Sequence, residues 1–236
     1  MSLELTNISF THPGSPKGSR RLLEDINLRI AGGELVGLSA PSGAGKSTLL
    51  RIAALMLGAD SGTVSLNNRL ITANHEVPLD VRRSMGVVLQ SPRAAADPRL
   101  RLESLICAPL DFRAGALRPR PQKHAERLGQ LADLMQLPPT LLRSYPHQVS
   151  DGQLQRALIA RSLVLEPSVL ICDEPTAALD AQTTRTILRV LARQAANGTA
   201  VLVASHDAAA LGQVAHRVQD LAGLGSPLSD PVEHFS

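Results

Sequence analysis

The chain has 236 residues and a net charge of +3 at neutral pH, with 44% hydrophobic and only 2% aromatic residues. This composition predicts a globular chain with a core of its own, and the scarcity of aromatic side chains argues against a nucleic-acid partner read by base stacking. No apolar run approaches the ~20 residues that cross a bilayer, and the first residues show no secretion signal. We therefore expect any membrane role to come through a partner.

The first third of the chain predicts three strands and a helix. Residues 3–10 and 22–30 alternate or run apolar in the manner of strands. Residues 34–39 are a short apolar run that enters a glycine-rich loop, and residues 46–57 then carry apolar side chains at helical spacing. The order is strand, loop, helix.

The rest of the chain predicts a helical segment between buried strands. Residues 85–89 form another short strand, and residues 98–165 are rich in Leu, Ala and Arg at helical spacing. Residues 169–172 and 200–204 are apolar strands of a buried parallel sheet, separated by a helix over residues 181–196. We predict an α/β fold with an all-α insertion between core strands.

The loop after the third predicted strand is typical of a phosphate-binding loop. Phosphate oxygens need several N–H donors that converge on one anion, and Gly43 and Gly45 let the backbone approach closely, ahead of the positive end of the next helix. Lys46, one of only three lysines, would reach the β- and γ-phosphates of ATP, and the Ser47 hydroxyl would bind Mg²⁺. Ala40 replaces the first glycine of the motif, which requires a negative φ there. The predicted ATP-binding residues of this loop are Ser42, Gly43, Ala44, Gly45, Lys46, Ser47 and Thr48.

Polar side chains follow three of the predicted strands. Asp173 comes at the end of a buried strand, where a carboxylate that holds Mg²⁺ belongs, and the adjacent Glu174 can act as the general base for an attacking water. His206 follows the neighbouring strand and is expected beside the γ-phosphate. Gln90 follows the strand at 85–89 and is a candidate Mg²⁺ ligand at a junction between domains. The predicted catalytic residues are therefore Glu174 and His206, and the predicted Mg²⁺ ligands are Ser47, Gln90 and Asp173.

The order of these motifs resembles the nucleotide-binding subunit of ABC transporters, over residues 3–221. The resemblance rests on SGAGKST at 42–48, Gln90, VSDGQ at 149–153, LICDEP at 170–175, AALD at 177–180 and His206. It implies a P-loop NTPase core, in which a parallel sheet is joined by an antiparallel N-terminal β subdomain, with an inserted all-α helical subdomain. It also implies ATP hydrolysis coupled to transmembrane transport, with ATP and Mg²⁺ as cofactors.

The resemblance also implies boundaries along the chain. Residues 1–92 and 166–222 would form the two parts of the nucleotide-binding core, and residues 93–165 the helical subdomain that carries the signature motif. Residues 223–236 would be a short tail, and we expect the chain after Leu221, which is punctuated by Gly, Ser and Pro, to be loosely ordered.

The VSDGQ segment resembles the signature that completes the ATP site of an opposite subunit. By this resemblance Ser150, Gly152 and Gln153 would contact the γ-phosphate of ATP held by the partner, and Asp180 would end the loop that couples the two sites. Two subunits would hold two ATP molecules between them, and hydrolysis would reopen the pair. The Gln90 region and the helical insertion would pass this movement to the membrane domains.

A finer resemblance is to the peptide/nickel importer subfamily. It rests on LQSP at 89–92, DPRL at 97–100, APL at 108–110 and YPH at 145–147. It implies import of peptides, nickel or metal–chelator complexes, at the cytoplasmic face of the inner membrane. The implied partners are transmembrane permeases, a sister ATP-binding subunit and, indirectly, an extracytoplasmic substrate-binding protein, with no nucleic acid.

The chain departs from the family pattern in three places. His12 stands where an aromatic residue usually stacks on adenine, so it is the predicted base contact but a weaker one. Asp151 replaces the first glycine of the signature, and its carboxylate either points away from the γ-phosphate or weakens that site. This asymmetry favours a pair with a distinct sister ATPase, although a homodimer stays open. A short tail follows where many subfamily members have a C-terminal extension, so no role of such an extension is expected here.

Three other functions stay open at this point. One is a soluble ABC ATPase, although neither a second ATPase domain nor a long coiled coil is visible in the sequence. Another is an accessory subunit of a phosphonate-degrading complex. The third is the motor of an exporter, because the motor motifs do not fix the direction of transport.

Overall fold

The computed structural model describes residues 2–12, 14, 21–71, 77–177 and 179–225. Ala178 of the AALD motif and residues 226–236 of the expected tail lie outside the described residues. Among the described helices, none has both the length and the apolar character needed to cross a membrane.

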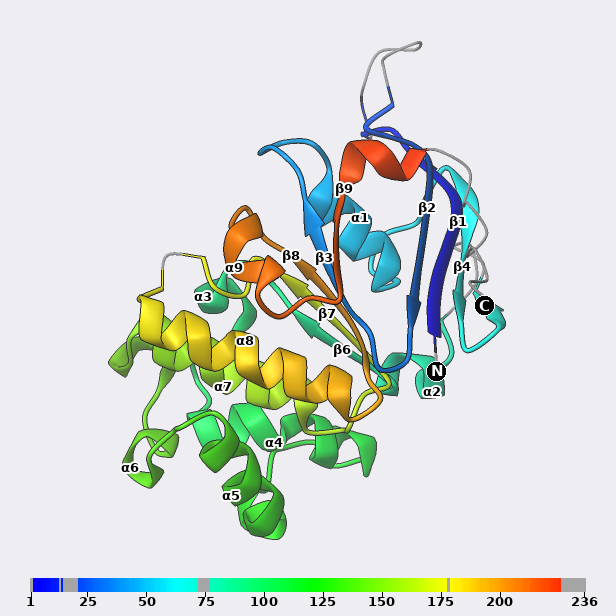
Figure 1. The fold of residues 1–236 in the computed structure, drawn as a ribbon. Coiled ribbons are helices and arrows are strands. Elements are labelled where there is room, and N and C mark those ends of the chain that lie inside the picture. The colour runs from blue at the N-terminus through cyan, green and yellow to red at the C-terminus, as the bar shows by residue number, and fades with distance from the viewer. Residues whose placement is uncertain (1, 13, 15–20, 72–76, 178, 226–236) are drawn as a thin grey trace, which may run out of the picture.

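A four-stranded antiparallel sheet forms one side of the molecule (Figure 1). Its order is β2-β1-β4-β5, made of β1 (Ser2–Phe10), β2 (Leu23–Ala31), β4 (Ser61–Leu66) and β5 (Arg69–Ile71). The strands predicted at 3–10 and 22–30 are confirmed to within one residue. β4 and β5 were not predicted, and they are joined at Asn67 and Asn68, whose φ angles are +52° and +61°. An Asn-Asn pair at positive φ is typical of a tight hairpin turn, so the turn residues were the sequence feature that could have predicted this hairpin.

A five-stranded parallel sheet forms the centre of the fold, in the order β6-β7-β8-β3-β9. Its strands are β3 (Leu35–Ser39), β6 (Met85–Val88), β7 (Val169–Asp173), β8 (Ala200–Ala204) and β9 (Arg217–Asp220). All residues of β7 and β8 are buried, as expected for strands covered on both faces. β9 was not predicted, because its sequence RVQD is short and three of its four residues are polar.

Helix α1 (Lys46–Ala53) lies between the two sheets (Figure 1). The prediction that this helix extends to residue 57 is wrong. Leu55 adopts a φ of +57°, and the backbone N–H of Met56 donates to the carbonyl of Arg51. A residue in the left-handed conformation just past a helix ends it in this way. Apolar side chains beyond that point pack against the core, although they are not part of the helix.

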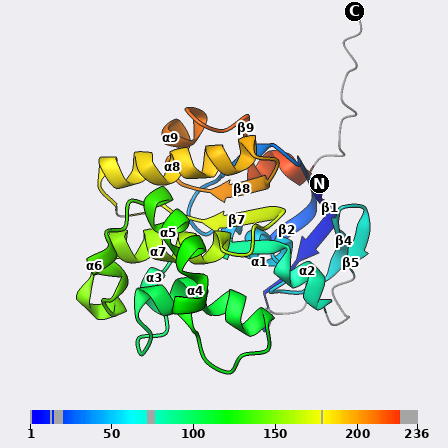
Figure 2. The same ribbon diagram turned by 90° about the horizontal axis from the view of Figure 1, so that it is seen from below.

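Helices cover the other face of the parallel sheet (Figures 1 and 2). Between β6 and β7 the described elements are all helical, as the predicted insertion requires. They are α3 (Pro92–Ala95), α4 (Leu102–Arg113), η1 (Pro121–His124), α5 (Ala125–Leu134), α6 (Pro139–Leu142), η2 (Pro146–Gln148) and α7 (Asp151–Leu163). Short α2 (Leu79–Arg83) precedes β6, α8 (Ala181–Ala196) follows β7, and α9 (Ala208–Gly212) follows β8. The helix predicted at residues 181–196 is confirmed in full.

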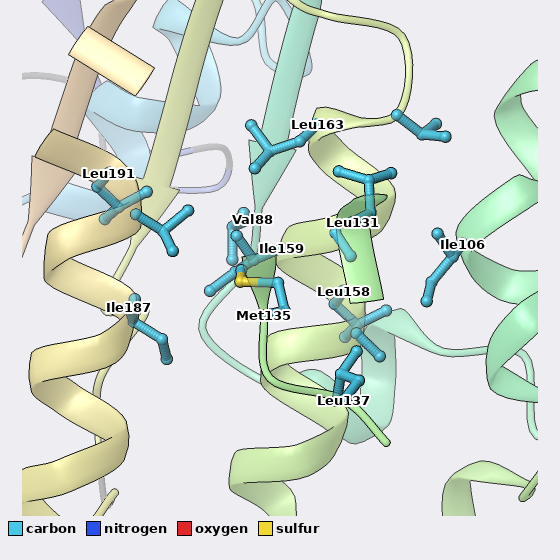
Figure 3. Packing of buried hydrophobic residues seen from close by; sticks show 14 of the residues in the cluster. Val88, Ile106, Leu131, Met135, Leu137, Leu158, Ile159, Leu163, Ile187 and Leu191 are labelled. Carbon is cyan, nitrogen blue, oxygen red and sulfur yellow. The ribbon is translucent and has the colours of Figure 1, made fainter. Parts of the chain in front are cut away.

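Two hydrophobic clusters share the strands of the parallel sheet. In β7, Val169 and Ile171 face the cluster with α1 and the antiparallel sheet, whereas Leu170 and Cys172 face the helical cluster. Figure 3 shows the helical cluster, where side chains from α5, α7 and α8 meet Val88 of β6. Alternate residues of a strand point to opposite faces, so each central strand stabilises both cores.

The chain after β9 forms a short 3₁₀ helix, η3 (Leu221–Gly225), which packs against β2. Leu221 and Leu224 are 4% and 5% exposed. The expectation of loose order directly after Leu221 is therefore wrong for residues 222–225, because the two leucines complete the cluster beside the antiparallel sheet.

Candidate functional site

The loop between β3 and α1 is shaped by two glycines in the left-handed region. Gly43 has a φ of +79° and Gly45, which precedes the first residue of α1, has a φ of +102°. Ala40 lies outside that region, which is the negative φ that its place in the motif requires. Among the described residues, no side chain caps the start of α1, and its first turn holds no acidic residue. The N–H groups at this helix end are thus left for another acceptor.

Lys46 lies at the centre of this loop and is only 8% exposed. Its ammonium group donates to the carbonyl oxygens of Ala40, at 2.5 Å, and Pro41, at 3.3 Å. A buried ammonium held by neutral carbonyls attracts an anion strongly, because phosphate oxygens offer charge as well as lone pairs.

A pocket of about 280 Å³ opens over this loop at the carboxyl edge of the parallel sheet. Nine of the predicted site residues line it together. They are His12, Ser42, Gly43, Gly45, Lys46, Ser47, Thr48, Gln90 and Glu174. Leu22 and Pro41 complete the lining and were not predicted as site residues. The chain ends of β3, β6 and β7 meet here, and this is the edge at which open α/β sheets bind ligands.

A larger groove of about 890 Å³ lies at the opposite edge of the sheet. Its lining includes Pro167 and Ser168 before β7 and Thr199 before β8, so it faces the amino ends of the strands. None of the predicted site residues lines it. Size alone therefore does not identify the functional site in this chain.

Asp173 lies behind the pocket at the end of β7 and is 5% exposed. Burial raises the pKa of its carboxyl group, and the hydrogen bond from Ser47 acts in the opposite direction. Its Oδ1 atom is buried and has no hydrogen-bond partner among the described residues. Together with the Ser47 hydroxyl and the Gln90 amide at the pocket wall, this orphaned oxygen makes an all-oxygen donor set that fits Mg²⁺. Among the described residues, no group of three or more His, Cys, Asp or Glu side chains is placed to hold a metal ion.

Glu174 and His206 form a pair at the mouth of this site. Glu174 Oε2 lies 2.8 Å from His206 Nδ1 and 3.3 Å from the His206 backbone nitrogen, which donates to it. Glu174 is 8% exposed and has a φ of +47°, whereas the imidazole is mostly exposed. Strained backbone at a buried carboxylate that lines a pocket is typical of a functional position. His206 contacts Glu174, and it is Glu174 that lines the pocket.

His12 enters the pocket from the end of the first strand. Its ring stands edge-on to Phe10, with the ring centroids 5.8 Å apart. An imidazole that is supported on one side by an aromatic ring can offer a face to a planar ligand. The structure thus brings the predicted base contact into the lining.

The signature residues lie outside this pocket, at the start of α7. Ser150 Oγ accepts from the Gln153 N–H at 3.2 Å, and Gln153 Oε1 accepts from the Ser150 N–H at 2.9 Å. This reciprocal pair is a capping box. A Cβ at Gly152 would meet the Thr183 side chain at 3.4 Å, and the Asp180 carboxylate caps the same α8 end through the Thr183 N–H. The predicted signature and Asp180 therefore lie side by side.

The Asp151 carboxylate turns toward Arg93, whose Nε donates to Oδ1 at 2.7 Å. Arg93 was not predicted to take part in the site. The two residues are 58 positions apart, so no local spacing in the sequence could have joined them.

Comparison with known proteins identifies the family. The sequence profile of the family described as ABC transporter matches residues 23–177, more than half of the chain. The chain belongs to the ABC transporter family. The match begins at β2 and includes the phosphate-binding loop, the signature segment and the Asp173–Glu174 pair.

Several ABC import proteins are similar to this chain. A putative peptide import ATP-binding protein of Brucella abortus is 36% identical over 209 residues, 86% of this chain. The oligopeptide transport ATP-binding protein OppF of Escherichia coli is 32% identical over 86% of this chain. The sulfate/thiosulfate import ATP-binding protein CysA of Vibrio cholerae is 40% identical over 81% of it. The chain spans 62%, 61% and 48% of the lengths of these relatives, respectively.

A solved ABC structure has the same fold. The ATP-binding cassette MJ0796, in a dimeric post-hydrolysis state bound to ADP and Pi, superposes with a TM-score of 0.81 at 29% identity. The superposition covers 92% of this chain and 93% of that one. The predicted P-loop NTPase fold, with its antiparallel sheet and inserted helices, is thus confirmed.

Proposed function

We propose that this chain is the ATP-hydrolysing motor subunit of an ABC importer. The observation that carries the proposal is the position of Glu174. It lines the same pocket as the phosphate-binding loop, and His206 orients its carboxylate. A loop that binds phosphate, next to an oriented base, supports hydrolysis of the bound nucleotide and not its binding alone.

The pocket binds ATP through its phosphates. The loop from Ser42 to Thr48 donates N–H groups to the β- and γ-phosphates, with Ala44 as part of the same backbone turn, and Lys46 exchanges its two carbonyl partners for phosphate oxygens. His12 stacks on the base at the other end of the pocket. Ser47, Gln90 and Asp173 would hold Mg²⁺, which would offset the phosphate charge.

Hydrolysis uses a water molecule beside Glu174. The water oxygen forms a bond to the γ-phosphorus while the bond from that phosphorus to the β,γ-bridging oxygen breaks, and the proton of the water passes to Glu174. ADP and inorganic phosphate result. His206 holds the Glu174 carboxylate in place, so the base and the γ-phosphate keep one orientation through the step.

The active form pairs two such subunits. Ser150, Gly152 and Gln153 contact the γ-phosphate held by the partner, and Asp180, which lies beside them, couples the two sites. The dimeric state of MJ0796 supports this arrangement for a chain of the same fold. We propose a distinct sister ATPase as the partner, with a homodimer as the alternative.

The importer contains transmembrane permeases, on which this chain sits at the cytoplasmic face of the inner membrane as a peripheral subunit. An extracytoplasmic binding protein delivers the cargo to the permeases. We propose peptides, nickel or metal–chelator complexes as cargo, and the similarity to the Brucella and OppF peptide import proteins supports peptides. The name of the CysA relative extends the candidate cargo to sulfate-like anions.

The first test is recovery of the tagged chain from membranes, with mass spectrometry of the proteins that come with it. Two permeases and a second ATP-binding subunit support the importer. A soluble complex without a membrane component contradicts it and favours a phosphonate-degrading accessory subunit or a soluble ABC ATPase. A permease without a binding protein encoded nearby favours an exporter.

The second test is Glu174→Gln in the recovered complex. It removes the base but keeps the volume and hydrogen-bonding capacity of the side chain, so ATP turnover is expected to fall by about 10²–10⁴-fold. ATP binding is retained. Glu166→Gln is a matched control, because Glu166 is exposed and lies at the opposite edge of the sheet. Unchanged turnover in Glu174→Gln would show that Glu174 is not the base.

A further inference from the structure

Arg93 connects the segment after Gln90 with the start of the signature helix. It lies in α3, which packs on α7, and Gln90 just before it lines the nucleotide pocket. Each nitrogen of its guanidinium group contacts the segment from Pro146 to Asp151. Nε donates to Asp151 Oδ1 at 2.7 Å and Nη2 to the Val149 carbonyl at 2.8 Å, while Nη1 donates to the Pro146 carbonyl.

Fold stability does not explain this pair. The side chains of Arg93 and Asp151 are 43% and 63% exposed, and exposed ion pairs contribute little to stability. Arg161 of α7 separately donates to the Ala95 carbonyl at 2.9 Å, so α3 keeps a second hydrogen bond to α7 without Arg93. The place of the pair, at the first residue of α7, points to electrostatics at that helix end.

The Asp151 carboxylate disfavours the binding of an anion at the start of α7. The helix end and the signature backbone attract a phosphate, whereas an ionised carboxylate one residue from Ser150 and Gly152 repels it. A guanidinium bound to that carboxylate cancels its charge and fixes its direction.

We propose that Arg93 is a positioning residue that neutralises Asp151 and holds its carboxylate away from the γ-phosphate of ATP in the partner's site. The inference rests on the proposed function, because it needs the signature to face that phosphate. Arg93 thus makes an acidic signature compatible with ATP, and an aspartate at this position does not weaken the composite site while Arg93 is present.

The test compares four forms of the complex recovered from membranes: wild type, Arg93→Ala, Arg93→Ala with Asp151→Asn, and Arg99→Ala. Arg99 is the matched control, because it forms an exposed ion pair with Asp97 a few residues further along the chain. The readout is the ATP concentration that gives half-maximal turnover. We expect Arg93→Ala to raise it about tenfold, which corresponds to about 1.4 kcal/mol.

Two further readouts separate charge from structure. Asp151→Asn removes the charge without changing the volume, so the double variant is expected to return to within about twofold of wild type. The Arg93→Ala defect is also expected to shrink as salt is raised from about 0.1 M to about 0.5 M, because salt screens exposed charges. Arg93→Lys keeps the charge and is expected to retain most of the affinity for ATP.

Two results overturn the inference. One is a double variant as impaired as Arg93→Ala, which would assign the defect to the lost contacts with Pro146 and Val149. The other is an Arg93→Ala form indistinguishable from Arg99→Ala. Failure of the proposed function is separate, because it appears as wild-type turnover that Glu174→Gln does not reduce, whatever the state of Arg93.

Discussion

Helices α1 and α7 both begin at a site that we assign to a phosphate, but their first turns are built in opposite ways. The start of α1 has a glycine at positive φ, no side-chain cap and no acidic residue. The start of α7 has a capping box made by Ser150 and Gln153, and its first residue is the acidic Asp151. One helix end leaves its N–H groups free for a ligand, and the other satisfies part of them within the chain.

This difference is consistent with different roles for the two helix ends. An end that binds its own nucleotide gains from uncapped N–H groups, because a phosphate then replaces the missing acceptors. An end that meets a nucleotide only when two subunits close must be stable while no phosphate is present, and a capping box provides that stability. Four variants test the comparison.

The largest expected effect is at Lys46, whose ammonium donates to neutral carbonyl oxygens, whereas the cation at the start of α7, Arg93, is paired with the Asp151 carboxylate. Lys46→Ala removes the ammonium that is held over the loop, so the affinity for ATP is expected to fall by about 10–100-fold, or about 1.4–2.7 kcal/mol. Titration of the isolated chain with a fluorescent ATP analogue measures it. Lys123→Ala, at an exposed lysine of the helical insertion, is the control and should bind as wild type does. Equal affinities for the two variants would remove the assigned role of Lys46.

Gly45→Ala tests the uncapped geometry of α1. A side chain at a φ of +102° is strained, and its Cβ would lie 3.0 Å from Leu23 and 3.2 Å from Leu22. The free energy of unfolding is expected to fall by about 1–3 kcal/mol, measured by urea denaturation. Gly129→Ala in α5 is the matched control, because no described residue lies within 4 Å of a Cβ added at that position. That control should stabilise the chain by about 0.5–1 kcal/mol, since alanine is the better helix former.

Ser150→Ala tests the capped end. It removes the acceptor of the Gln153 N–H, and loss of such a cap costs about 1 kcal/mol. Thermal unfolding of the isolated chain measures the change. Ser162→Ala, in the last turn of the same helix, is the control, because its hydroxyl only donates back to the Ile159 carbonyl. A cap that mattered only for ATP would leave the unfolding temperature of Ser150→Ala unchanged.

The smallest effect is expected at Asp180, which caps α8 beside the signature. Hydrogen bonds from the Thr183 side chain and backbone hold the pKa of the Asp180 carboxyl below its ordinary value of 3.8. The stability it contributes is therefore present above that value and is lost as the pH falls through the lower pKa of the folded state. Asp180→Asn should flatten the loss of stability that occurs as the pH falls below 3.8, in unfolding curves recorded as a function of pH. If Asp180→Asn lost stability at acid pH just as wild type does, the pH dependence would come from other carboxyl groups.

Local patterns in the sequence identified much of this site. The loop at 42–48 was predicted because its glycines and lysine are close together in the sequence. The pair Asp173–Glu174 was predicted because it directly follows an apolar strand. The structure places most of these side chains in one pocket, as the order of strands and loops requires.

Long-range and weakly patterned features could not be predicted in the same way. β9 has no periodic signal, and it pairs with β3 over a separation of about 180 residues, with Leu221 and Leu224 buried directly after it. The ion pair of Arg93 and Asp151 depends on the packing of α3 on α7, which one-dimensional spacing does not encode. The sequence therefore left open whether the Asp151 carboxylate points away from the γ-phosphate or weakens the site, and its hydrogen bond with Arg93 favours the first alternative.

The strand order also bears on how the protein is made. β3, which leads into the phosphate-binding loop, is bonded to β8 and β9. Those strands span residues 200–204 and 217–220, so a chain that emerges from the ribosome carries its loop long before the neighbours of β3 exist. Pairing over such separations is slow. We therefore expect the phosphate-binding loop to reach its final position late, after β8 and β9 have been made and have paired with β3.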